Sequence, residues 1–72
     1  MLQVVDQGVM ERIFAVTDAL GIHREQIVVP LGARHPGRVR RMPNGKLEIV
    51  VESEDHEAFL AGLEANLRRL LA

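Results

Sequence analysis

The sequence predicts a small α+β domain in which a helix, three strands and a second helix form two layers. Three observations carry this prediction. Apolar residues repeat at helical spacing near both ends, β-branched and charged residues alternate in the middle, and a Pro-Asn-Gly turn divides that middle segment. We expect the order α-β-β-β-α, with a small antiparallel sheet whose hairpin covers residues 38–52 and packs against two amphipathic helices.

The first helix is predicted by an apolar stripe whose members are three or four residues apart. This spacing keeps them on one helix face: Leu2, Val5, Val9, Ile13, Val16 and Leu20. The start of the helix is open, because Asp6 can cap a helix that begins just after it, while Gly8 disfavours an earlier start. Gly21 followed by the apolar Ile22 predicts a Schellman end.

A short strand and a loop follow the first helix. The run Ile27-Val28-Val29 is typical of a buried strand, which Pro30 ends or places at a sheet edge. Residues 30–37 contain two prolines and two glycines and predict the one real loop of the chain.

The hairpin is predicted from its turn. Met42-Pro43-Asn44-Gly45 fits a type I turn followed by a G1 bulge, since Pro43 lacks the N–H that a two-residue turn would need. This turn pairs Arg40 with Glu48 and gives the strands two faces. We expect an apolar face made by Val39, Leu47, Ile49 and Val51, and an outward face made by Arg38, Arg40, Glu48 and Glu52.

The second helix is predicted to begin after Ser53, a good N-cap. Acids fill the first predicted turn, where the helix dipole favours negative charge, and Glu64 is placed to pair with Arg68. The apolar face consists of Phe59, Leu60, Leu63, Leu67, Leu70 and Leu71.

Charge is segregated along the chain although the formal net charge is only −1. The stretch 26–46 has no acid and carries +5, between flanks of −2 and −4. Its basic side chains are candidates for contact with an anion or a partner, because guanidinium groups bind phosphate and carboxylate in a bidentate way. The candidates are Arg34, His35, Arg38, Arg40, Arg41 and Lys46.

Two interpretations of this basic stretch stay open. In one it contacts the phosphates of a nucleic acid, as a nucleic-acid-binding or ribosome-associated factor would. In the other it is a ladder of ion pairs within the fold, such as Arg40 with Glu48. The chain has no Tyr or Trp, and both Phe residues fall on helix faces, so no platform for stacking bases is expected.

Length and composition predict one domain, residues 1–72, that is compact and works by binding. A 72-residue chain has a thin core, and no cysteine is present to staple it, so we expect self-association as a dimer. The basic hairpin of one subunit could face the acidic segment Glu54-Asp55-His56-Glu57 of another. A third alternative is an accessory subunit of a larger complex.

Catalytic and metal chemistry are not expected. Ser53 and Thr17 have structural roles, no two histidines have metal-ligand spacing, and no cofactor motif occurs. The layout is similar to that of minimal zinc peptidases, but Gly62 and Asn66 stand where their His-Glu-x-x-His ligands would be. No apolar run predicts a membrane span or a signal peptide, which leads us to expect a cytoplasmic protein. The arginine-rich basic content would suit a thermophile.

Overall fold

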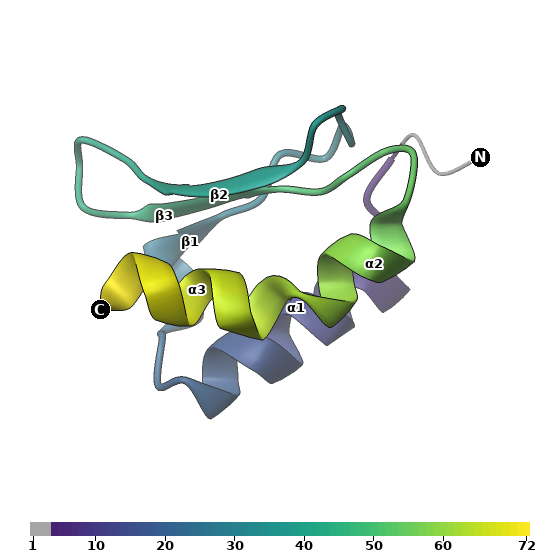
Figure 1. The fold of residues 1–72 in the computed structure, drawn as a ribbon. Helices are drawn as coiled ribbons and strands as arrows, with labels where there is room; N and C mark the ends of the chain where they lie inside the picture. The colour runs from purple at the N-terminus through teal and green to yellow at the C-terminus, as the bar shows by residue number, and fades with distance from the viewer. Residues whose placement is uncertain (1–3) are drawn as a thin grey trace.

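The computed structural model describes residues 4–72 and confirms a small two-layer α+β fold (Figure 1). Both the first and the last helical segments lie on the same face of a three-stranded open sheet. The elements are α1 (Gln7–Ala19), a 3-10 turn (Arg24–Gln26), β1 (Ile27–Val28), β2 (Arg38–Arg41), β3 (Leu47–Val50), α2 (His56–Ala61) and α3 (Leu63–Leu71). Within residues 4–72, no helix is both long enough and apolar enough to cross a membrane.

The start of α1 is set by Asp6, as the sequence allows. The Asp6 carboxylate accepts a hydrogen bond of 2.9 Å from the backbone N–H of Val9, which satisfies one of the free donors of the first turn. Val9 and Ile13 are buried as the stripe predicts. Val5 is also buried, but it precedes α1 and its N–H donates to the Leu31 carbonyl at 2.7 Å, so its assignment to the helix is wrong. Leu2 lies outside the described residues.

The end of α1 is the predicted Schellman motif. Gly21 has a φ of 76°, its N–H donates to the Asp18 carbonyl, and the N–H of Ile22 donates to the Thr17 carbonyl. Ile22 is buried against the core, which supplies the apolar contact that this motif favours.

The sheet has the strand order β1-β3-β2 and is mixed. The expectation of an antiparallel sheet is correct for β2 and β3 but wrong for β1, which runs parallel to β3 with Ile27 opposite Leu47. Parallel neighbours need a long connection, and here residues 29–46, which include β2, provide it.

The hairpin adopts the predicted turn and register. The N–H of Met42 donates to the Lys46 carbonyl at 2.7 Å, the N–H of Gly45 donates to the Met42 carbonyl at 2.9 Å, and Gly45 has a φ of 86°. Arg40 lies opposite Glu48. The predicted inner face is confirmed, because Leu47, Ile49 and Val51 are buried.

The C-terminal helix differs from the prediction in two ways. It begins at His56 with Asp55 as its N-cap, so the assignment of Ser53 as the cap is wrong. The N–H of Ser53 instead donates to the Arg34 carbonyl at 3.0 Å, which connects this residue to the segment 30–37. The helix is also interrupted at Gly62, which separates α2 from α3.

The core lies between the sheet and the helices. Its fully buried side chains come from α1, β3 and α3, with Val51 just beyond β3: Ile13, Thr17, Ile49, Val51, Leu63 and Leu67. Val50 is also buried but lies outside this main cluster. By strand alternation Val50 faces the opposite side of the sheet, where it lines a groove together with Pro30, Arg34, His35 and Pro36.

Candidate functional site

The six basic candidates lie on the segment from Arg34 to Lys46, and all six are exposed. They are not equivalent, because two of them are already paired. Arg40 donates to the Glu48 carboxylate at 2.7 Å, and His35 contacts Glu52 and Glu54. Among residues 4–72, the other four have no carboxylate within ion-pair distance: Arg34, Arg38, Arg41 and Lys46.

The segment 30–37 is tied to β3 rather than being a free loop. The N–H of Arg34 donates to the Val51 carbonyl at 2.9 Å, and the Arg34 carbonyl accepts from Ser53. These bonds continue the parallel pairing begun by β1, with Arg34 opposite Glu52. The backbone that carries Arg34 is therefore held at the edge of the sheet.

Glu52 organises this segment, a role that the sequence reasoning missed. One carboxylate oxygen accepts from the N–H of Gly37 at 2.9 Å, and the other accepts from the N–H of Glu54 at 3.0 Å and contacts His35 Nδ1 at 2.7 Å. These donors, the two backbone N–H groups first, lower the pKa of Glu52 to about 2. Extending the hairpin register by two residues, to Pro36 opposite Glu52, would have indicated the contact.

His35 connects this segment to the chain that follows β3 through contacts with Glu52 and Glu54. Its Nδ1 lies 2.7 Å from Glu52 and 3.1 Å from a carboxylate oxygen of Glu54. The hydrogen bond to Glu52, with the two negative charges, raises the pKa of His35 and favours its protonated form. His35 is thus matched to acids of its own chain.

Among residues 4–72, the side chains of His35, Glu52 and Glu54 form the group that could coordinate a divalent cation. The nitrogen and the two carboxylate oxygens lie within 4.8 Å of one another. However, both oxygens of Glu52 already accept hydrogen bonds from backbone N–H groups. The contacts of His35 with Glu52 and Glu54, and the backbone hydrogen bonds to Glu52, account for this cluster without a metal.

A groove of about 340 Å³ lies on the face of the sheet that the helices leave open. Arg34 and Arg38 line it, and the buried Val50 contributes an apolar surface. We call this the arginine groove; its lining residues are Pro30, Arg34, His35, Pro36, Arg38, Glu48 and Val50. It combines two free guanidinium groups with rigid proline walls, which suits an anion with a compact body.

A second hollow of about 300 Å³ lies on the other side of His35, at the start of α2. Ala58 and Phe59 give it apolar walls, and carboxylates surround them. We call this the acidic hollow; its lining residues are His35, Glu52, Glu54, Asp55, Ala58 and Phe59. Such a hollow suits a cation on an apolar stem.

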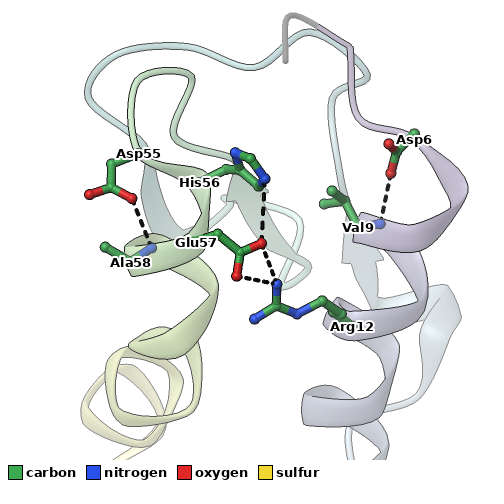
Figure 2. A network of polar contacts seen from close by, with 7 residues as sticks. All are labelled: Asp6, Val9, Arg12, Asp55, His56, Glu57 and Ala58. Atoms are coloured by element: carbon green, nitrogen blue, oxygen red, sulfur yellow. Dashed lines mark hydrogen bonds and ion pairs between the residues drawn. The ribbon is translucent and has the colours of Figure 1, made fainter. Parts of the chain in front are cut away.

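The remaining acid of the predicted acidic segment has a different function. Glu57 accepts two hydrogen bonds from the Arg12 guanidinium, at 2.9 and 2.8 Å, which links α2 to α1 (Figure 2). His56 Nε2 lies 3.5 Å from the same carboxylate. Glu57 thus pairs with α1, whereas Glu54, which contacts His35, and Asp55, which caps α2, border the acidic hollow.

The Thr17 hydroxyl is enclosed within the fold. Thr17 is fully buried, and its hydroxyl donates to the Phe14 carbonyl at 3.3 Å. Comparison with known proteins adds no further assignment, because no family model, no curated protein and no solved structure matches this chain. The arginine groove and the acidic hollow are therefore the features from which a function can be inferred.

Proposed function

We propose that this chain is a small cytoplasmic binding module without catalytic chemistry, and that the arginine groove holds phosphate groups of a nucleic-acid backbone. One observation carries the proposal. Arg34 and Arg38 line the same groove, and neither has an acidic partner among the described residues. A guanidinium that the fold leaves unpaired beside a groove is available to a phosphate.

The support for a phosphate, rather than a base, comes from the aromatic residues. The chain has two Phe and no Tyr or Trp. The guanidinium of Arg24 lies 4.4 Å from the ring centre of Phe14, and Phe59 packs against the core. Neither ring belongs to the groove, so the contact we propose is made to the backbone and does not depend on base sequence.

The local charge also supports the proposal despite the acidic total. The pairing of Arg40 with Glu48 and of His35 with Glu52 neutralises the acids nearest to the groove. Arg34 and Arg38 then supply the net positive charge there. Over distances longer than about 8–10 Å at physiological ionic strength, the acids elsewhere on the chain are screened.

The test is binding of a labelled duplex DNA and a labelled single-stranded RNA, followed by fluorescence anisotropy over a range of salt concentrations. Two phosphates contacted per chain predict a slope of log K against log salt of about −2 for the duplex. Arg34→Gln and Arg38→Gln should each weaken binding and reduce the magnitude of this slope by about 1.

Arg69→Gln is the matched control, because it removes the same charge from an exposed site on α3. Its effect should be much smaller than that of either groove variant. Failure of both nucleic acids to bind at low salt would refute the proposal. So would equal losses for Arg38→Gln and Arg69→Gln, since these would reflect total charge rather than the groove.

A further inference from the structure

We infer that the acidic hollow receives the hairpin end of a second copy of this chain. The hollow joins two features that a basic side chain needs. Ala58 and Phe59 can pack along an aliphatic stem. Glu54 and Asp55 are exposed beside them, and each has a second carboxylate oxygen, besides the one that contacts His35 or the Ala58 N–H, that can meet the charged head. The inference does not depend on what the arginine groove binds.

The hairpin end provides side chains of matching chemistry. Arg41 and Lys46 flank its turn, both are exposed, and neither has a carboxylate within ion-pair distance among residues 4–72. The turn residues Pro43, Asn44 and Gly45 are exposed as well. The hairpin end is thus a narrow, positively charged projection without an acidic partner in its own chain.

The positions of the two features favour a closed pair over an open chain of molecules. The hairpin turn lies at one end of the molecule and the start of α2 at the other, along a longest dimension of 32 Å (Figure 1). Two copies that lie side by side in opposite directions can therefore make the same contact twice. A twofold arrangement of this kind satisfies both hairpin ends and both hollows.

Pairing through the sheet edges is a weaker explanation for a dimer. The edge strand β1 has only two residues and is followed closely by Pro30. The other edge strand, β2, has the sequence Arg38-Val39-Arg40-Arg41, so two copies paired along it would bring arginines together. Short edge strands, proline and charge all oppose edge-to-edge pairing.

The test begins with the mass of the protein in solution, measured by analytical ultracentrifugation at low and at high salt. We expect twice the mass of one chain at about 0.1–0.5 mM protein and low salt, and a shift toward monomer near 0.5 M salt because the contacts are screened. A protein that stays monomeric at the highest concentration and low salt overturns the inference.

Charge reversal then locates the interface. Lys46→Glu and Glu54→Lys should each weaken the dimer by about tenfold or more, since each turns two attractive contacts into repulsive ones. A mixture of the two variants should form a heterodimer again, because each contact then joins opposite charges. Circular dichroism of each variant confirms that it is folded.

Glu11→Lys is the matched control for Glu54→Lys, because Glu11 is exposed on α1, away from the hollow. Measured alone, Glu11→Lys should dimerise as the parent does, unlike Glu54→Lys, because it keeps both Lys46 and Glu54. A dimer that is insensitive to Lys46→Glu, or a mixture with Glu54→Lys that stays monomeric, overturns the assignment of this interface.

Discussion

Gly37→Ala tests whether the segment 30–37 is fixed as closely against β3 as the structure indicates. A Cβ at Gly37 would lie 2.6 Å from the Glu52 nitrogen, 2.8 Å from the Glu52 Cα and 2.8 Å from the Val50 oxygen. All three are backbone atoms of the neighbouring strand, so no side chain can rotate away to make room. The two backbones must separate.

The cost follows from this displacement. Overpacking of a close contact destabilises by about 1–3 kcal/mol, and the smaller entropy of the unfolded alanine chain offsets at most about 1 kcal/mol of it. For a domain of this size, each kcal/mol lowers the melting temperature by about 4–8 °C. We therefore expect Gly37→Ala to lower the melting temperature by about 5–20 °C.

The measurement is thermal and urea unfolding followed by far-ultraviolet circular dichroism, because the chain has no tryptophan for fluorescence. Gly32→Ala is the matched control, since a Cβ there would have no atom within 4 Å and the backbone is not in the positive-φ region. It should leave stability within about 0.5 kcal/mol of the parent. Equal melting temperatures for the two variants would refute the close packing of Gly37 against β3.

Four further predictions concern stability and protonation. Asp6→Ala should cost about 1 kcal/mol in urea unfolding through loss of the α1 cap, and Asp6→Asn should recover most of it. Leu67→Ala should lower the free energy of unfolding by about 2–5 kcal/mol because Leu67 is fully buried. Leu71→Ala should change it little, since Leu71 is 42% exposed. Glu52→Gln should lower the pKa of His35 measured by NMR; an unchanged pKa would exclude Glu52 as the main cause. The raised pKa of His35 should add stability that is full below pH 6.5 and lost as the pH rises through the folded value, and His35→Asn should abolish this dependence.

The features that depend on a few adjacent residues could be predicted from the sequence. The left-handed Gly21 and the buried Ile22 complete a helix end within six residues, and the Pro43-Asn44-Gly45 turn sets the whole hairpin register. In both cases the backbone bonds join atoms that are close along the chain. Local chemistry was therefore sufficient.

The errors arise where distant segments compete for the same backbone groups. Ser53 has the chemistry of an N-cap, but its N–H bonds to the Arg34 carbonyl, and the helix begins only after Asp55. The parallel direction of β1 likewise depends on how residues 29–46 cross the sheet, which periodicity does not encode. These are tertiary contacts between segments about 20 residues apart along the chain.

The sequence indicated which basic side chains gather in one segment, but not which of them are paired with acids. Charge segregation singled out the segment that borders the arginine groove, yet it could not distinguish paired from unpaired cations. Arg40 and Arg38 are two residues apart on one strand face, and only Arg40 has an acid opposite it. That difference depends on which residue lies across the strand, with Glu48 facing Arg40 and Val50 facing Arg38.

His35 forms part of the lining of both the arginine groove and the acidic hollow. The His35 imidazole thus borders both a surface suited to anions and a surface suited to cations. A ligand on either side that moves this ring changes the shape and the charge of the other side. Since such an influence is equal in both directions, binding in the arginine groove and contact at the acidic hollow would be coupled if either one moved this ring.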